Sequence, residues 1–254
     1  MNDPAPLPDV TLSPLGVIES DFPDKFGVPR QPGLAPSARA TLRLLPPYDD
    51  PLAVRGLEAF SHLWLTFLFH LSPERAGPEG WSPLVRPPRL GGNRQIGVFA
   101  SRSTHRPNRL GLSLVELLGI DTRRGVRLQL AGADLVSGTP VLDIKPYLPW
   151  AEARPEARAG FAPEAPDRLA VHFTRAAETA LARREDGASL RALIEEVLSQ
   201  DPRPAYRNGG EARRYGVRLR DLDVRFQAVA TADGTTTLEV VDIVPAEIAK
   251  GPMG

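Results

Sequence analysis

A stretch rich in arginine, residues 86–113, holds the side chains best suited to binding an anion. It reads RPPRLGGNRQIGVFASRSTHRPNRLGLS and contains six arginines and no carboxylate, in a chain of zero formal net charge. A guanidinium is always charged and makes forked hydrogen bonds to phosphates and carboxylates. Six such groups repel one another unless an anionic partner or distant acids compensate them. We therefore interpret the stretch as a binding surface; the plainer alternative is a solvated basic surface.

Turn-forming residues surround these arginines and suggest how they are presented. Pro87-Pro88, Gly91-Gly92-Asn93 and Pro107-Asn108 all favour turns. A short strand is predicted between them, from Ile96 to Ala100. The pattern indicates two basic loops at the two ends of one strand, which is how a rigid scaffold presents binding groups.

Composition limits the class of protein. The 254 residues are 42% hydrophobic, enough for one large or two ordinary domains. With no cysteine, disulfides, thiolate metal sites and a cysteine nucleophile are excluded, and the four histidines lack zinc-ligand spacing, so no metal is expected. No apolar run reaches the ~20 residues of a membrane span. The N-terminus, MNDPAPLPDV, lacks the pattern of a secretory signal, so we expect a cytoplasmic protein.

The first 150 residues read as many short strands separated by turns. Residues 38–44 alternate, with Ala38, Ala40, Leu42 and Leu44 on one face, as in a half-buried antiparallel strand. Further strands are predicted at 15–20, 62–70, 126–130 and 141–144, while 112–120 is ambiguous between strand and helix. A short helix is predicted within 48–59, capped by Asp49 or Asp50 with Pro51 in its first turn. This pattern predicts an all-β sandwich or barrel.

The last 100 residues differ in character. Residues 151–166 are rich in Ala, Glu and Pro and read as a linker or a strap. A strand at 169–173, a helix at 175–184 capped by Thr174, and an amphipathic helix at 189–200 are predicted. A second basic stretch contains Arg203, Arg207, Arg213, Arg214, Arg218 and Arg220, with Tyr206 and Tyr215 among them. A hairpin of 219–230 and 235–244 ends the pattern. We predict two domains, 1–155 and 156–254.

Function can be argued only coarsely from these residues. Two basic clusters with interleaved tyrosine and histidine favour RNA or another polyanion as partner. The sequence has no GxGxxG after a strand and no GxxxxGK[ST] phosphate loop. Nothing in the residue types alone points to methyl transfer.

Several long segments resemble the TrmO (TsaA or YaeB) family: FGVPRQPGL, RPPRLGGN, GVFASRSTHRPNRLGLS, DLVSGTPVLDIKPYLPWAE and YGVRLRDLDVRF. The resemblance implies a mainly β fold, a single-sheet β-barrel (TsaA-like) followed by a small α+β C-terminal domain. It implies an enzyme that uses S-adenosyl-L-methionine to methylate N6 of N6-threonylcarbamoyladenosine, just 3′ of the tRNA anticodon. It also implies a homodimer with the cofactor near the subunit interface.

The same resemblance implies a set of cofactor contacts. They are Pro29, Arg30, Gln31, His70, Leu71, Arg102, Leu112, Asp134, Leu135, Val136 and Ser137. Arg102 or Arg30 suits the cofactor's carboxylate, and Asp134 suits its ammonium or an adenine amino group. Leu71 stands where relatives often carry a polar residue such as Gln, which removes any side-chain contact made there.

A catalytic set is proposed from the segment DIKPY. The substrate N6–H must lose its proton while the nitrogen attacks the methyl, and Asp143, Tyr147 and His105 are candidate bases, with Lys145 to steady negative charge. Asp143 and Lys145 share a face if the strand is extended. We select Asp143, Lys145 and Tyr147 as catalytic candidates; the alternative is a structural strand end with a surface ion pair.

The arginines most suited to tRNA come from both basic stretches: Arg86, Arg89, Arg94, Arg106, Arg109, Arg213, Arg214 and Arg218. Phosphate contacts of this kind weaken steeply with salt. Two other readings stay open: a non-catalytic RNA-binding β-barrel, and a small-molecule enzyme with an anionic substrate that ignores tRNA.

Overall fold

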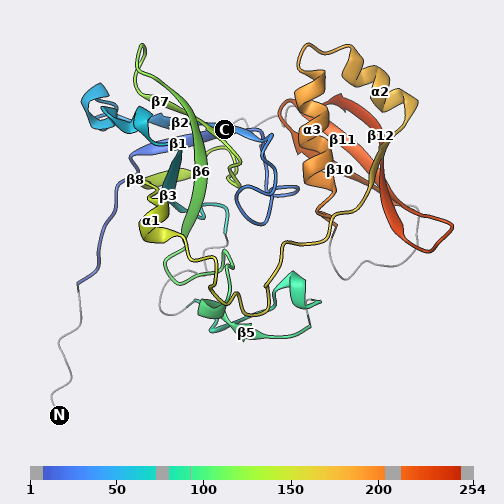
Figure 1. Cartoon of the computed structure of the whole chain (residues 1–254), viewed down its shortest axis with the longest axis horizontal. Helices are drawn as coiled ribbons and strands as arrows, with labels where there is room; N and C mark the ends of the chain where they lie inside the picture. The colour runs from blue at the N-terminus through green and yellow to red at the C-terminus, as the bar shows by residue number, and fades with distance from the viewer. Residues whose placement is uncertain (1–7, 73–79, 92, 204–212, 247–254) are drawn as a thin grey trace, which may run out of the picture.

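The chain folds around a closed antiparallel barrel of six strands (Figure 1). This computed structural model describes residues 8–72, 80–91, 93–203 and 213–246. The barrel strands are β1 (Gly16–Ser20), β2 (Arg39–Leu44), β3 (His62–Leu68), β6 (Leu110–Asp121), β7 (Arg127–Ala131) and β8 (Pro140–Pro146), in the order β1-β2-β7-β6-β3-β8. The predicted mainly β barrel fold is confirmed, and the ambiguous segment 112–120 is strand β6 rather than helix.

Strict alternation explains why one face of each strand is buried in the barrel core. In β3, Leu63, Leu65 and Phe67 are buried in the barrel core while the residues between them face outward. Gly111 of β6 pairs with Phe67, and a β-carbon at Gly111 would lie 2.3 Å from the Phe67 ring. Glycine is therefore required there by the close approach of an aromatic side chain.

The segment 48–59 forms two 3-10 turns instead of the expected helix. The turns are Pro51–Val54 and Leu57–Ala59, and the Asp50 carboxylate caps the first by accepting a hydrogen bond from Leu52 N at 2.8 Å. Gly56 separates them with φ of 86°, a left-handed conformation that ends regular helix. Asp50 is thus the capping residue of the two that were considered.

The strand expected at 96–100 is shorter than predicted. Only Ile96–Gly97 (β5) is extended, pairing with Leu84–Val85 (β4), and Val98–Ala100 forms a 3-10 turn. The reason is that Val98 is buried and Ser101 N donates to its carbonyl at 3.2 Å, which turns the chain. A further 3-10 turn, Pro88–Leu90, lies in the arginine-rich stretch.

The second unit is a sheet covered by two helices. Its strands β9 (Val171–Phe173), β10 (Arg214–Leu219), β11 (Leu222–Ala230) and β12 (Thr236–Pro245) lie in the order β10-β11-β12-β9, with β9 parallel to β12. Helix α2 (Arg175–Ala182) is capped by Thr174 as predicted, and α3 (Gly187–Leu198) packs its apolar stripe into the core. A short helix α1 (Pro149–Glu152) follows the barrel.

One strand of this unit was not predicted, and one boundary was predicted wrongly. The second basic stretch contains strand β10, to which no element was assigned, and Leu219 was placed in the following strand. The chain instead turns at Arg220-Asp221, with Arg220 at φ of 55°, so Leu219 ends β10 and Leu222 begins β11. A two-residue turn without glycine gives little signal in the sequence.

The loop between β1 and β2, residues 21–38, joins the two units and lies between them in Figure 1. Phe22, Ala35 and Ala38 from this loop belong to the hydrophobic core of the second unit rather than to that of the barrel. Arg220 Nε pairs with the Asp21 carboxylate at 3.0 Å, and Ser37 Oγ donates to Glu196 at 2.8 Å. The C-terminal unit therefore holds the loop expected to bind cofactor.

Candidate functional site

Asp134 is a carboxylate held inside the rim of the barrel. Ser113 on β6, itself fully buried, donates from Oγ to Asp134 Oδ1 at 2.6 Å. Burial raises the pKa of the Asp134 carboxyl. The Ser113 hydroxyl, the backbone amide of Asp134 and the Arg102 guanidinium act in the opposite direction. A buried acid beside a cation is suited to binding an ammonium or amino group that replaces water.

The bend that carries Asp134 is fastened to the end of β1. Ser20 Oγ donates to the Leu135 carbonyl at 2.7 Å, and Ser20 N donates to Ser137 Oγ at 3.0 Å. Ser137 N donates to the Phe22 carbonyl at 2.8 Å. Leu135 is buried in the barrel core, whereas Val136 and Ser137 are half-buried and more accessible to a ligand.

His70 lies against the same bend. A β-carbon at Gly138 would lie 3.7 Å from His70 Nε2, which places the imidazole beside residues 134–138. Burial, with a smaller contribution from the Lys25 ammonium, lowers the pKa of His70, so its ring is neutral at pH 7. A neutral imidazole offers one donor and one acceptor.

Leu71 is tied to the loop between β1 and β2 through its main chain. Lys25 Nζ donates to the Leu71 carbonyl, and the Leu71 side chain is exposed. The hydrogen bond from Lys25 to the Leu71 carbonyl therefore does not depend on the side chain at position 71. Lys25 thereby links the 21–38 loop to the end of β3.

The loop residues expected to bind cofactor lie close to the bend. Gly33 N donates to the Gly132 carbonyl at 2.8 Å, which brings the loop to within two residues of Asp134 along the chain. Pro29 is buried, Gln31 is half-buried and Arg30 is exposed. The structure thus brings the loop, His70, Arg102 and the Asp134 bend to one end of the barrel, although the role of each residue stays a prediction.

Leu112 occupies a different surface from Asp134. Its neighbour Ser113 points into the barrel, and the Leu112 side chain points outward with 51% of its surface exposed. In the pairing across β8, β3 and β6, Thr66 lies between Leu112 and Asp143. Leu112 therefore belongs to an outer face that also carries the catalytic candidates.

The catalytic candidates lie along that outer face. Asp143 and Lys145 are exposed with Ile144 half-buried between them, so the expectation that they share one face is confirmed. Tyr147 packs edge-on against His62 and Trp64, with ring centroids 6.4 and 6.1 Å apart. Lys145 is close enough to Glu152 to lower the pKa of that carboxyl, after the larger effects of its hydrogen bonds from Leu148 N and Trp64. The catalytic roles themselves remain predictions.

The arginines expected to contact tRNA are presented on loops and on strand β10. Arg86, Arg89 and Arg94 are exposed, and Arg106 and Arg109 are half-buried, with Arg106 Nη1 donating to the Ser101 carbonyl at 2.9 Å. Arg213 and Arg214 are exposed, and Arg218 Nε is buried with no hydrogen-bond partner among the described residues. Of the other arginines in the second basic stretch, Arg207 lies outside the described residues, whereas Arg203 and Arg220 pair with Asp201 and Asp21.

Three residues of this arrangement were missed in the sequence. Ser113 and Ser20 position the Asp134 bend, and Lys25 joins the loop to Leu71. Ser113 had a usable signal, because a serine at an inward position of a strand needs a buried partner. Ser20 and Lys25 had none, since their partners are more than 40 residues away along the chain.

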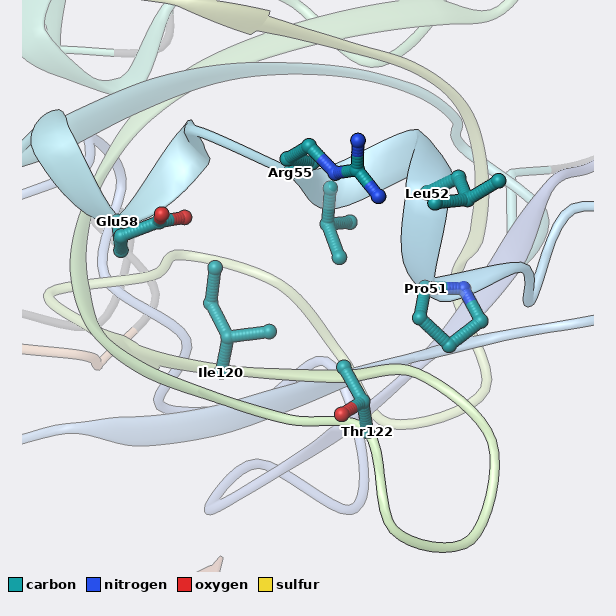
Figure 2. Close-up of a pocket in the computed structure, with 7 residues that line it drawn as sticks. Pro51, Leu52, Arg55, Glu58, Ile120 and Thr122 are labelled. Atoms are coloured by element: carbon teal, nitrogen blue, oxygen red, sulfur yellow. The ribbon is translucent and has the colours of Figure 1, made fainter.

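Two surface hollows are lined partly by residues 51–60. One of about 420 Å³ is lined by Pro51, Leu52, Val54, Arg55, Glu58, Ile120 and Thr122 (Figure 2). A second of about 590 Å³ includes Leu15, Tyr48, Phe60 and Asp143. Neither contains a residue expected to bind cofactor. Within the described residues, no group of three or more His, Asp or Glu side chains is arranged to hold a metal, and no helix is long and apolar enough to cross a membrane.

Fold and site together define a barrel protein with a hydrogen-bonded carboxylate at its rim and exposed arginines on its loops. Two family models match the chain: the tRNA-methyltransferase O N-terminal domain over residues 17–153 and the TrmO C-terminal domain over residues 166–246. The chain therefore belongs to the TrmO family, as the resemblance in its sequence implied.

Individual relatives agree with this assignment. The chain is 54% identical over 217 residues to the Escherichia coli tRNA (adenine(37)-N6)-methyltransferase, covering 84% of this chain and 91% of the relative. A Pseudomonas aeruginosa protein, provisionally named an S-adenosylmethionine-dependent methyltransferase, is 52% identical over 85% of this chain and 91% of its own length. The crystal structure of TrmO from Pseudomonas aeruginosa superposes with a TM-score of 0.74 at 43% identity, covering 93% of this chain and 98% of that one.

Proposed function

We propose that this protein is an S-adenosyl-L-methionine-dependent tRNA methyltransferase that methylates N6 of adenine 37. The observation that carries the proposal is the half-buried Asp134 carboxylate, hydrogen-bonded by Ser113 and close enough to Arg102 for its charge to act on it, in a chain that matches both TrmO domains. The matched relatives are named for this reaction.

The residues present fit the cofactor. S-Adenosyl-L-methionine has an ammonium, a carboxylate and an adenine amino group, and it supplies a methyl group on a cationic sulfur. Asp134 accepts from an amino or ammonium group, Arg102 or Arg30 pairs with the carboxylate, and neutral His70 has one donor and one acceptor to offer. Leu135, Val136 and Ser137 follow Asp134 in the same bend, and their backbone groups are further expected contacts.

The substrate is, more finely, N6-threonylcarbamoyladenosine 3′ of the anticodon. Its N6 carries a proton that must leave as the nitrogen attacks. Asp143 is the favoured proton acceptor, because Asp143 is exposed and shares an outer face with Leu112. Thr66 on β3 lies between Asp143 on β8 and Leu112 on β6. Lys145, opposite Trp64 on β3, steadies the developing negative charge, and Tyr147 is the second candidate base. Orientation of the reacting groups supplies up to about 7–11 kcal/mol.

Two copies of the chain form the working enzyme. The outer face of β6 exposes Leu110 and Leu112, with Leu114 half-buried beside them, and an apolar strip of this kind favours contact with a second copy. We place the division between the barrel and the C-terminal domain at 155/156 and the reaction in the cytoplasm, where tRNA is available. Light scattering at enzyme concentrations that support turnover should give the mass of a dimer.

The decisive experiment is transfer of a radiolabelled methyl group to bulk tRNA that carries or lacks the threonylcarbamoyl group. We expect labelling of the first preparation only. Binding of tRNA without calorimetric binding of S-adenosyl-L-methionine would instead identify a non-catalytic RNA-binding barrel. Labelling of both preparations would remove the threonylcarbamoyl requirement.

A further inference from the structure

Two aromatic side chains lie together outside both hydrophobic cores. Phe99 sits at the centre of the 3-10 turn Val98–Ala100 and is 71% exposed, although its neighbour Val98 is only 1% exposed. The Trp81 ring lies beside it, with ring centroids 5.9 Å apart and a 36° angle between planes. An exposed phenylalanine paired with a tryptophan is an apolar surface that folding leaves in contact with water.

The two rings are held by the small β4–β5 ribbon. Leu84 pairs with Gly97 and Val85 with Ile96, and Val98 N donates to the Pro83 carbonyl at 2.8 Å. Trp81 precedes β4 and Phe99 follows β5, so both leave the ribbon at the same end. The ribbon lies apart from the barrel in Figure 1, at the lower edge of the molecule. Backbone hydrogen bonds thus hold the segments that carry the two rings side by side, so part of the cost of ordering them is met before any ligand binds.

The surroundings of the rings are cationic. The Arg106 guanidinium carbon lies 5.9 Å from the centre of the Phe99 ring, and Arg106 is steadied by its bond to the Ser101 carbonyl. Between residues 80 and 115 the sequence contains six arginines and no carboxylate. Exposed aromatic faces within a positive surface match a ligand that has flat rings joined by phosphates. An acidic protein surface would satisfy the charges but not the flat, exposed ring faces.

We propose that Phe99 and Trp81 form a stacking platform for an unpaired base of the tRNA anticodon loop. The proposal rests on the proposed function and extends it, because neither residue belongs to the expected cofactor or RNA contacts. Arginines of the surrounding loops hold the phosphates, while the aromatic pair distinguishes an unpaired loop from a duplex, whose bases are already stacked.

The test compares Phe99→Leu with the wild-type protein on two RNA probes. The first probe is an unmodified anticodon stem-loop, and the second is a fully paired RNA duplex of the same length. We expect Phe99→Leu to bind the stem-loop about 5- to 150-fold more weakly, the range given by loss of one stacked base. Binding to the duplex should not change. Phe99→Tyr retains the ring and should bind both probes as wild type does.

A matched control separates stacking from charge. Arg86→Gln removes a phosphate contact, so it should weaken binding to both probes and reduce the dependence on salt by about one ion. A stem-loop with 2-aminopurine at an unpaired loop position reports stacking directly. Its fluorescence should be quenched by wild type and by Phe99→Tyr but not by Phe99→Leu, with S-adenosyl-L-methionine affinity unchanged in all three.

Equal binding of the stem-loop by wild type and Phe99→Leu would overturn the platform while leaving the methyltransferase assignment intact. A change in the mass of Phe99→Leu by light scattering, with RNA binding unchanged, would also overturn it and assign the rings to a protein contact. Ring-dependent binding of the stem-loop by a protein that transfers no methyl group would support the platform and refute the proposed function.

Discussion

At the residue scale, the site depends on a carboxylate whose charged form is disfavoured by burial. Asp134 is held at the rim by Ser113, and its burial disfavours the charged form. A raised pKa means that the folded protein is destabilised by ionising this group at neutral pH. Such a cost is expected where a charge is kept for binding rather than for stability.

Replacing Asp134 by Asn should separate these two effects. The amide oxygen still accepts from Ser113, and the cost of burying a charge disappears, so the melting temperature should not fall. Loss of a charged hydrogen bond worth about 1.5–3 kcal/mol should weaken S-adenosyl-L-methionine binding by about 10- to 150-fold. Calorimetry and thermal melting measure both. A variant that melts earlier yet binds cofactor normally would show that Asp134 is only structural.

The stability of the cofactor-free protein should depend on His70 in mildly acidic solution. The pKa of His70 is lowered in the folded state, so as pH falls below 6.5 the unfolded chain takes up the proton first. Stability contributed by the neutral ring is therefore full above pH 6.5 and declines as pH approaches the lowered value. Between pH 7.5 and pH 5, the melting temperature should fall by more for wild type than for His70→Gln. His105→Gln is the control. Equal falls in all three would contradict this.

At the scale of elements, alternation along the barrel strands divides binding from core. The inward residues of β3 and β6 fill the barrel, whereas the outward residues Thr66 and Leu112 form a continuous row with Asp143 on β8. Three strands distant in sequence thus contribute neighbouring side chains to one outer face. That face needs no loop to position it, which favours precise placement of reacting groups.

The row predicts that Asp143 acts in the chemical step. Asp143→Asn should lower methyl transfer at saturating cofactor and tRNA by about 100- to 10,000-fold, the usual contribution of a positioned base. Glu116→Gln changes an exposed acid on β6, which is separated from β8 by β3; it is the matched control and should retain activity. Lys145→Met and Tyr147→Phe complete the series. Weaker tRNA binding with an unchanged chemical step would defeat the catalytic assignment.

At the scale of the whole molecule, the C-terminal unit supports the cofactor site. The 21–38 loop places Phe22 in the core of that unit, and Arg220 holds Asp21 through its side chain and through a hydrogen bond from its backbone N at 2.8 Å. Arg220 Nη1 also pairs with Asp186 at 2.8 Å. The second unit is therefore more than a tRNA contact, because it fixes a loop that borders the barrel site.

Arg220→Met tests this coupling. The change keeps the aliphatic stem but removes the cation paired with Asp21, which is 9% exposed and retains its hydrogen bond from Arg39 N, and it should cost about 3 kcal/mol of stability. Because the loop loosens, cofactor affinity should fall by about 10-fold even though Arg220 is not itself an expected cofactor contact. Arg225→Met removes a surface pair with Asp223 and is the control. Unchanged cofactor affinity in Arg220→Met would show that the loop is fixed by other contacts.

The local patterns of this sequence determined a good deal. Alternating residues such as Ala38 to Leu44 predicted barrel strands, Thr174 predicted a helix start, and the long family segments predicted membership of the TrmO family. These signals are local because strand periodicity and capping depend on residues a few positions apart.

Only the tertiary structure decided which residues meet. The bond from Ser113 to Asp134, the neighbouring positions of Asp143 and Leu112, and the hold of Arg220 on Asp21 each join residues at least 20 positions apart. Strand order in a closed barrel sets such contacts, and alternation within one strand carries no information about its neighbours. The sequence could not predict, for the same reason, that the 21–38 loop packs into the core of the C-terminal unit.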